Sequence, residues 1–313
     1  INNIEHHIDA NHLLTNYAAL SIAGKIFNRE DSFKRLYEKT FISQFSSLHY
    51  ERSTSYTKQL IYEAYIYKSI VGIDNKYMIE KIEQSLNTLS FLNDEKITLN
   101  FVDNIYEQAL DTKIILSLFK FKDKYKHLFL DRFSKIDNFL IIRDGIFNLA
   151  IDVGTPSPYY QPGHAHDSTF AIELYIRKVP IFISGGISTY DNLELRSFER
   201  SKGNYSKIQS DYIFQDTWGG FRVGNRTECD YKTFNKKFRA FCTEGYERTI
   251  IVENNLIIKD KTKFHKNNLV QYIFSPDIKP KVKNNSSLEF YIEGRCYIIK
   301  FLDECNFFLK DHL

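Results

Sequence analysis

The run from Tyr159 to Asp167 holds the densest group of chemically capable side chains, including His164 and His166 separated by a single alanine. If this run lies on a strand, alternate residues face the same side, so both imidazoles point to one face of a sheet. Two imidazoles on one face suit a metal ligand, or a ligand beside a catalytic acid or base. A loop of hydrogen-bonded histidines without chemistry is an equally good interpretation of this segment taken alone.

Two further polar patches lie at predicted helix starts, one at residues 9–12 and the other at residues 51–56. The first turn of a helix presents free backbone N–H groups at the positive end of the helix dipole, which favours a bound anion such as a carboxylate. The alternative is purely structural, with Asp9 and Ser53 as N-caps and Tyr56 as a half-buried aromatic side chain.

The positions of proline and glycine divide the chain into two parts that follow different backbone rules. All six prolines lie at or after Pro156, and only two glycines precede Gly145. Because both residue types disrupt helix interiors, the first part is predicted to be helical. Apolar residues at helical spacing from Leu13 and across residues 102–110 agree, and a helix over 53–71 begins with a serine N-cap.

From about residue 137 the chain changes to short apolar runs separated by turn signals. Pairs of such runs flank the dipeptides Asp144-Gly145, Asn254-Asn255 and Glu293-Gly294. Strands that follow one another without intervening helices predict an antiparallel sandwich and argue against a doubly wound parallel sheet. We therefore place a domain boundary near residue 135, with helices in 1–135 and strands in 136–313.

The overall composition is that of a folded, globular protein with little excess charge. The 313 residues include 42 basic and 39 acidic side chains, giving a net charge of +3, and 43% are hydrophobic. This balance does not favour a nucleic-acid-binding protein, whose basic excess would be larger and clustered. No apolar run is long enough to span a bilayer. The four cysteines lack CxxC spacing, which favours buried free thiols over a zinc site or a disulfide framework.

Four segments resemble, in the same order along the chain, the motifs of the heparinase II/III-like superfamily of polysaccharide lyases, which includes alginate and oligoalginate lyases. They are Asn11 to Asn16 with Ala19-Leu20, Glu51 to Tyr56, Asp152 to Gly154 followed by Tyr160 to His166, and Trp218 to Arg222. The resemblance implies an incomplete α/α toroid of paired helices followed by an antiparallel β-sandwich, with the substrate cleft between them. Relatives carry more helices before the first motif, so we expect the chain to be the C-terminal part of a longer protein.

The chemistry that this resemblance implies is β-elimination on an acidic, uronate-containing polysaccharide. A base removes the proton next to the uronate carboxylate and the glycosidic oxygen leaves, so that an unsaturated uronate forms. Asn11 would neutralise the carboxylate, assisted by His12 or Arg52, and Tyr56 would act as base and then as acid. His164 would be a second acid or base, or a neutralising group, depending on the uronate epimer. The expected substrate-binding residues are His12, Arg52, Tyr160, His166, Trp218 and Arg222.

A tyrosine with a pKa near 10 is a poor base at neutral pH, so this assignment requires nearby positive charge. We expect Arg52 and the start of the helix to lower the pKa of Tyr56.

The metal site of many relatives is not retained in this sequence. Those relatives hold zinc through the second His of the HxH pair, an Asp at a strand end and a further His. Here Ser184 and Tyr205 occupy the last two positions, and a lone imidazole does not make a closed tetrahedral site. We therefore expect no metal and no other cofactor.

The leading interpretation is a polysaccharide lyase, and the main alternative is a catalytically impaired relative that binds polysaccharide or assists surface-polysaccharide assembly. The missing metal ligands favour that alternative. A glycoside hydrolase would require paired acid and base carboxylates facing a sugar, and no such pair stands out. A signal peptide upstream would place the protein in the periplasm, and the lack of one would place it in the cytoplasm.

Overall fold

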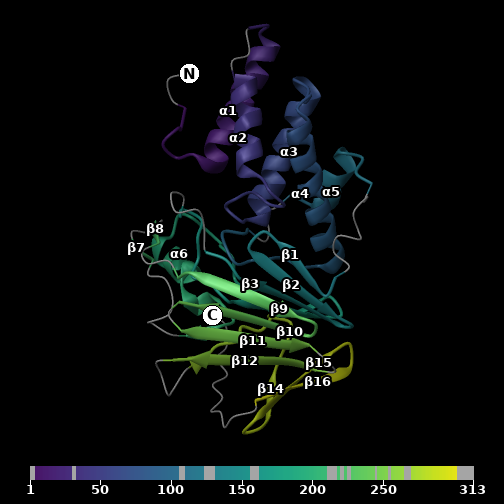
Figure 1. Ribbon diagram of the computed structural model, residues 1–313, viewed down its shortest axis with the longest axis vertical. Coiled ribbons are helices and arrows are strands. Elements are labelled where there is room, and N and C mark those ends of the chain that lie inside the picture. The colour runs from purple at the N-terminus through teal and green to yellow at the C-terminus, as the bar shows by residue number, and fades with distance from the viewer. Residues whose placement is uncertain are drawn as a thin grey trace.

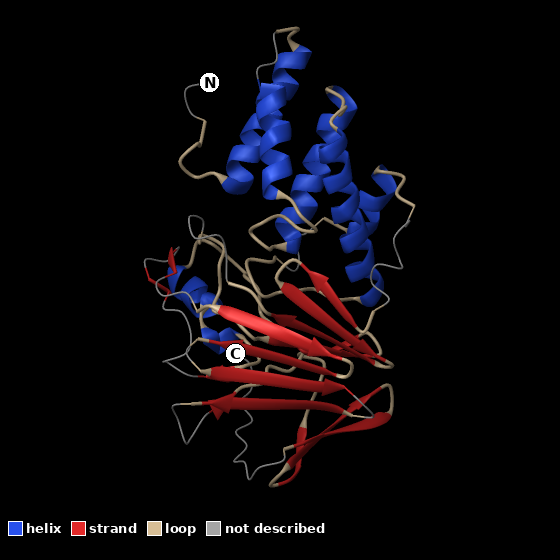
Figure 2. Ribbon diagram, viewed as in Figure 1, coloured by secondary structure: helices blue, strands red, loops and turns tan. Residues whose placement is uncertain are grey.

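The computed structural model has helices at one end of the molecule and antiparallel sheets at the other (Figures 1 and 2). It describes residues 4–29, 33–105, 110–122, 131–155, 162–209, 217–218, 222–223, 227–243, 245–252, 255–263 and 269–301. The predicted fold class, a helical part followed by an antiparallel sandwich, is confirmed. Closure of the helices into a toroid stays a prediction.

The helical part consists of consecutive helices that share one apolar core. They are α1 (Ala10–Ile26), α2 (Phe33–Gln44), α3 (Thr54–Ile70), α4 (Lys76–Glu95) and α5 (Thr112–Leu118). Helix α1 packs against α2 and α3, and its Leu14 joins Tyr37, Phe41 and Leu60 in the buried cluster. No helix in the described part of the chain is both long and apolar enough to cross a membrane.

The start of α3 follows the sequence prediction. The Ser53 side chain accepts a hydrogen bond from the backbone N–H of Tyr56 at 3.1 Å, which satisfies one of the free donors of the first turn. The helix predicted over residues 102–110 is wrong in its described part, because residues 101–105 are not helical. Phe101 and Val102 are instead fully buried, with Phe101 packed between the helices and the first sheet.

The first sheet has five strands, each antiparallel to the next along the chain. They are β1 (Phe133–Ile136), β2 (Phe139–Asp144), β3 (Phe147–Asp152), β4 (Ile172–Ile176) and β5 (Val179–Phe182). The predicted Asp-Gly turn joins β2 to β3, and Gly145 has a φ of 59°, a left-handed conformation that glycine adopts without strain.

The second large sheet has the order β12-β11-β10-β9, and a three-stranded sheet follows it. The remaining strands are β6 (Ile208–Gln209), β7 (Thr217–Trp218), β8 (Arg222–Val223), β9 (Cys229–Phe234), β10 (Lys237–Cys242), β11 (Tyr246–Val252), β12 (Leu256–Thr262), β13 (Leu269–Val270), β14 (Lys281–Asn284), β15 (Ser287–Ile292) and β16 (Arg295–Lys300). The predicted hairpin at residues 293–294 joins β15 to β16, and both turn residues have positive φ, as a type I′ turn requires.

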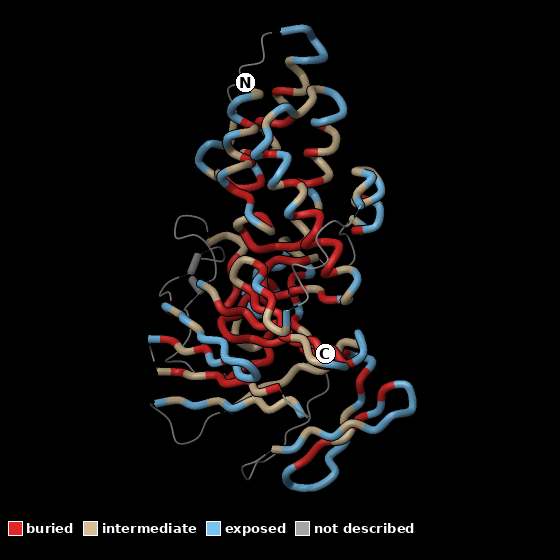
Figure 3. The backbone as a smooth tube through the Cα atoms, turned by 45° about the vertical axis from the view of Figure 1, so that its right-hand side comes forward, coloured by how far each residue is buried: buried red, intermediate tan, exposed pale blue. Residues whose placement is uncertain are grey.

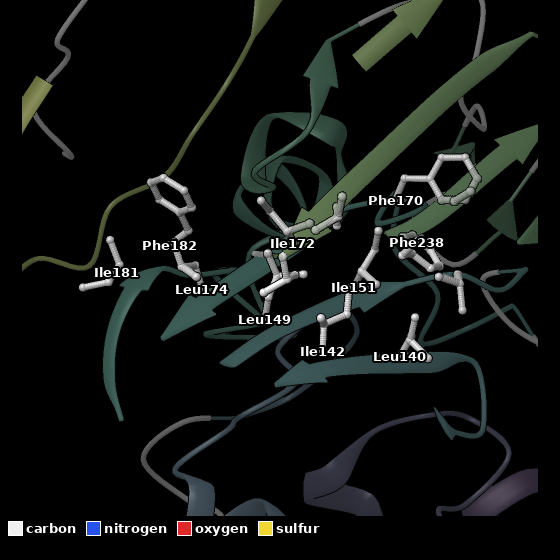
Figure 4. Packing of buried hydrophobic residues seen from close by; sticks show 14 of the residues in the cluster. Leu140, Ile142, Leu149, Ile151, Phe170, Ile172, Leu174, Ile181, Phe182 and Phe238 are labelled. Atoms are coloured by element: carbon white, nitrogen blue, oxygen red, sulfur yellow. The ribbon is translucent and has the colours of Figure 1, made fainter. Parts of the chain in front are cut away.

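The first sheet is buried on both faces, and this is what fixes the helices to the sandwich. Alternate residues of β2, such as Leu140, pack against Phe238 and other side chains of the second sheet (Figure 4). The residues between them, such as Phe139, pack against Phe101 and Leu48 from the helical part. Buried backbone accordingly concentrates where the two parts meet (Figure 3).

Candidate active site

A fully buried carboxylate, Asp103, is the centre of a polar cluster at the junction between helices and sheets. Its two oxygens lie 2.6 Å from His164 Nδ1 and 2.5 Å from His166 Nε2. The Tyr190 hydroxyl donates to it at 2.9 Å, and the Arg196 guanidinium approaches to 3.1 Å. Burial alone would raise the pKa of Asp103, but the bonds from both histidines hold that pKa well below its ordinary value.

Separate segments of the chain bring this cluster together. Asp103 follows α4, the two histidines lie in the link between β3 and β4, and Tyr190 and Arg196 lie before and within α6 (Leu193–Arg200). The side-chain oxygen of Asn104 accepts from the backbone N–H of Ser55 at 3.0 Å, in the first turn of α3. The start of α3 is therefore bonded to the segment that carries the buried carboxylate.

Tyr56 points from the first turn of α3 into this cluster. Its hydroxyl lies 2.5 Å from the Tyr190 hydroxyl, and its ring centroid lies 4.6 Å from that of His164. Tyr56 and His164, which are 108 positions apart in the sequence, therefore share one site. Because Tyr190 donates to Asp103, Tyr56 donates to Tyr190 in the simplest arrangement of protons.

The pKa of Tyr56 is raised in this structure, opposite to the direction expected from the sequence. Burial is the main cause, and the negative charges of Asp103 and Glu51 add to it. A hydrogen bond and the charge of Arg196 act in the other direction. Arg52, which we expected to lower this pKa, is ion-paired with Asp152 and is not among the main causes of the shift.

His164 lies between two carboxylates. Its Nδ1 is 2.6 Å from Asp103, and its Nε2 is 3.3 Å from Glu51 Oε1. Burial works to lower the pKa of His164, but the two carboxylates outweigh it and the pKa is raised. The side chain is 17% exposed, so part of the imidazole ring faces the outside of the cluster.

Asn11 lies at the start of α1, and the carboxylate of Glu51 is a neighbour of both Asn11 and His164. The backbone N–H of Asn11 faces Glu51 and helps to lower the pKa of that group, although burial works to raise it. The Asn11 side chain is 9% exposed, and its Oδ1 has no hydrogen-bond partner among the described residues. Asn11 is therefore close to the cluster and has an amide that a ligand could engage.

His166 is fully buried and has no nitrogen left for a metal ion. Its Nε2 faces Asp103, and its Nδ1 is bonded to the Tyr205 hydroxyl. The two histidines do not lie on a strand, in contrast to the arrangement considered from the sequence. Residues 162–171 form turns and bends instead. The two rings nevertheless converge, since both reach the same carboxylate. No group of three or more His, Cys, Asp or Glu side chains in the described residues is arranged to hold a metal, and the absence of zinc stays a prediction.

The burial of His166 and Arg52 argues against the direct substrate contacts that we expected for both. Arg52 is 2% exposed, forms an ion pair with Asp152 at the end of β3, and donates to the carbonyl oxygen of Thr155 at 2.7 Å. Its guanidinium also lies 4.6 Å from the centroid of the Phe139 ring. Arg52 therefore links the start of α3 to the first sheet.

The other expected substrate-binding residues are not joined to the cluster by any contact in the described part of the chain. His12 is exposed and bonded to Glu5 at 3.1 Å. Tyr160 lies outside the described residues. Trp218 and Arg222 are partners in the short pairing of β7 with β8, and their side chains lie outside the described part.

Sequence reasoning missed the residues that organise the cluster: Asp103, Tyr190 and Arg196, together with the role of Glu51. Asp103 was hidden within the stretch interpreted as a helix, and Tyr190 and Arg196 belong to no pattern that we used. Glu51 belongs to a recognised motif, but only the fold reveals that it faces His164.

A cavity of about 620 Å³ opens at another part of the junction. Its lining includes His49, Arg52 and Lys135 but neither Tyr56 nor His164. Among the described residues, the cavity therefore approaches the cluster only through His49, which faces Glu51.

Comparison with known proteins identifies the strand-rich part of the chain. Residues 136–265 match the family described as heparinase II/III-like, C-terminal. A solved structure described as a heparinase III gene product with methylated lysines has a TM-score of 0.44 and 11% identity, and the match covers 93% of this chain and 65% of that one. A likeness this distant does not bear on the chemistry, and no curated protein matches the chain significantly. Residues 136–265 are therefore similar to the heparinase II/III-like, C-terminal family.

Proposed function

We propose that this protein is a polysaccharide lyase that cleaves an acidic, uronate-containing polysaccharide by β-elimination at the cluster around Asp103. The observation that carries the proposal is the meeting of Tyr56 from the helical part with His164 from the family domain, at 4.6 Å between ring centroids. An elimination needs an acid or base beside a group that stabilises the substrate carboxylate, and this pair provides both.

In the proposed reaction a single residue, Tyr56, first accepts the proton and then donates it. Tyr56 enters the reaction as the tyrosinate, after its own proton has passed to solvent. The C5–H bond of the uronate then breaks and its proton passes to the oxygen of Tyr56. The electron pair left behind forms the double bond between C4 and C5, and the C4–O bond breaks with its electrons on the glycosidic oxygen. Tyr56 then returns the proton to that oxygen, so the reaction consumes no water and yields an unsaturated uronate.

The positive charge for the uronate carboxylate would come from His164, assisted by the amide of Asn11. The raised pKa of His164 favours the imidazolium, and its partial exposure allows contact with a ligand. The Nδ2 amino group of Asn11 is the donor that would bond the carboxylate, while its Oδ1 is an acceptor with no hydrogen-bond partner among the described residues. Together they would stabilise the negative charge that develops on the carboxylate when the C5 proton leaves.

The test is the nature of the product formed from a panel of uronate polymers, namely alginate, heparan sulfate and hyaluronate. A lyase gives fragments that absorb in the ultraviolet and that, by mass spectrometry, contain no added water. Fragments with added water and without that absorbance would indicate a hydrolase and would contradict the proposal. The longest available form of the protein should be used, because this chain spans 65% of the heparinase III chain compared above.

A relative that binds polysaccharide without cleaving it is the second candidate. The observation that favours it is the raised pKa of Tyr56, because a hydroxyl beside the carboxylates Asp103 and Glu51 resists losing its proton. This candidate predicts that calorimetry detects binding to a polymer of the panel while no product forms on any of them.

A further inference from the structure

Glu51 is a buried carboxylate that the proposed chemistry does not use, and it contacts groups from separate parts of the chain. The residue is 1% exposed. Its Oε1 lies 3.3 Å from His164 Nε2, and its Oε2 lies 3.3 Å from His49 Nδ1. The backbone N–H of Asn11, at the start of α1, faces the same carboxylate. The two proposed carboxylate-binding residues, Asn11 and His164, therefore share Glu51 as a neighbour.

The other side of Glu51 is connected to the turn before α1. His49 Nε2 is 3.0 Å from Gln44 Oε1, and the Gln44 amide donates to Asp9 Oδ1 at 3.1 Å. A continuous polar path therefore runs from Asp9, beside Asn11, through the end of α2 to His164. Every side chain in this path between its two ends is buried, so solvent does not compete for these contacts.

The backbone of Glu51 is held from the other part of the molecule. The next residue, Arg52, is ion-paired with Asp152 at the end of β3 and donates to Thr155. Glu51 is thus fixed to the sandwich through its chain neighbour and to α1 through its side chain. A change at Glu51 would alter the spacing between α1 and the loop of His164.

We infer that Glu51 is a positioning residue that sets the distance and orientation between His164 and Asn11, so that both address one substrate carboxylate. The inference rests on the proposed function. Among the described residues, His164 is faced by the side chains of Asp103, Glu51, Tyr190 and Tyr56 and by the charges of Arg196 and His49. Among these, Glu51 alone is also a neighbour of Asn11 and lies on the Nε2 side of the ring.

The experiment compares Glu51→Gln with Glu173→Gln. The glutamine at 51 keeps the shape of the side chain but removes the charge and one of its two acceptor oxygens. Glu173 is a matched control because it is also a fully buried glutamate at the junction. It accepts backbone N–H bonds from Leu99 at 3.1 Å and Asn100 at 2.8 Å, and neither His164 nor Asn11 is among its hydrogen-bond partners in the described residues.

The first measurement is the ring N–H spectrum of ¹⁵N-histidine-labelled protein at one fixed pH, without substrate, with His164 assigned from a His164→Gln sample. We expect the His164 ring signals to shift in Glu51→Gln and to stay unchanged in Glu173→Gln. Unchanged His164 signals in folded Glu51→Gln would overturn the inference. Because this measurement needs no activity, it decides the role of Glu51 even if the proposed function fails.

The second measurement is kcat and KM on the polymer of the panel that gives product. Loss of the ion pair between Glu51 and His164 predicts a kcat about tenfold to hundredfold lower for Glu51→Gln, with Glu173→Gln within a few-fold of wild type. Equal losses in both variants would indicate general destabilisation and would overturn the positioning role. If Glu51→Gln does not fold by circular dichroism, Glu51→Asp keeps the charge but shortens the reach. We expect it to shift the same ring signals and to lower kcat by a smaller factor.

Discussion

Replacing Asp103 by asparagine should destabilise the protein strongly, because its negative charge is balanced by buried partners. The carboxylate accepts bonds from four side chains, namely those of His164, His166, Tyr190 and Arg196. Asp103 itself is fully buried, so water does not reach its oxygens. Asparagine keeps one acceptor oxygen but turns an amide N–H₂ toward the remaining donors. Removing one partner of a buried ion pair costs about 3–5 kcal/mol in free energy of unfolding, and we expect Asp103→Asn to fall in that range.

The loss should depend on pH in a definite direction. The pKa of Asp103 in the folded protein is well below its ordinary value, so the folded state binds its proton less readily than the unfolded chain. The stabilisation is therefore complete above the ordinary pKa, about 3.8, and disappears as the pH falls through the lower folded value. Wild type and Asp103→Asn should differ most above about pH 5 and become more alike in acid.

Urea unfolding followed by circular dichroism measures this difference. The control is Asp111→Asn, because Asp111 is an exposed N-cap of α5 and asparagine caps a helix about as well as aspartate. That variant should change the free energy of unfolding by less than about 0.5 kcal/mol. If Asp103→Asn costs less than about 1 kcal/mol near neutral pH, Asp103 does not organise the cluster in the way described.

Four further predictions concern the same junction. Arg52→Lys should lower the free energy of unfolding by about 2 kcal/mol, because lysine does not bond Asp152 and a carbonyl oxygen at once; an unchanged urea midpoint would contradict this. Tyr205→Phe should lower the free energy of unfolding by about 1–3 kcal/mol in the same assay, because it leaves His166 Nδ1 without its partner. Elemental analysis of wild-type protein purified without chelator should find no stoichiometric zinc. The raised pKa of Tyr56 predicts that kcat/KM increases from neutral toward alkaline pH, whereas a profile that only falls with pH would argue against a tyrosinate base.

The fold could be anticipated wherever local chemistry decides the structure. The lack of proline before Pro156 agrees with the helical first part, although β1 to β3 also precede Pro156, and Ser53 caps α3 because its side chain meets the first-turn N–H groups. The helix predicted after α4 is wrong in residues 101–105. The apolar side chains there are spaced as in a helix, but they are buried by long-range packing. Phe101 fills the space between the helices and the face of β2 that carries Phe139, a long-range contact that periodicity does not reveal.

Only some residues of the candidate site could be predicted from the sequence, because the others depend on contacts between distant parts of the chain. Asn11, Tyr56 and His164 belong to sequence motifs, so their residue types and their order along the chain were informative by themselves. Asp103 and Glu51 act through partners far along the chain, and their importance appears only when the junction between helices and sandwich is assembled. The roles proposed for the motif residues are predictions for kinetics to test.

The most direct test of the account is the rate of Tyr56→Phe relative to Tyr62→Phe on a polymer that wild type cleaves. Tyr62 lies on the same helix and is partly exposed, so its replacement controls for changes in α3 that are unrelated to chemistry. With the release of unsaturated uronate followed by ultraviolet absorbance, Tyr56→Phe should lose at least about a hundredfold in kcat, as removal of an acid or base group does. Tyr62→Phe should match wild type. If Tyr56→Phe forms unsaturated product at the wild-type rate, Tyr56 is not the acid or base and the proposed mechanism is wrong.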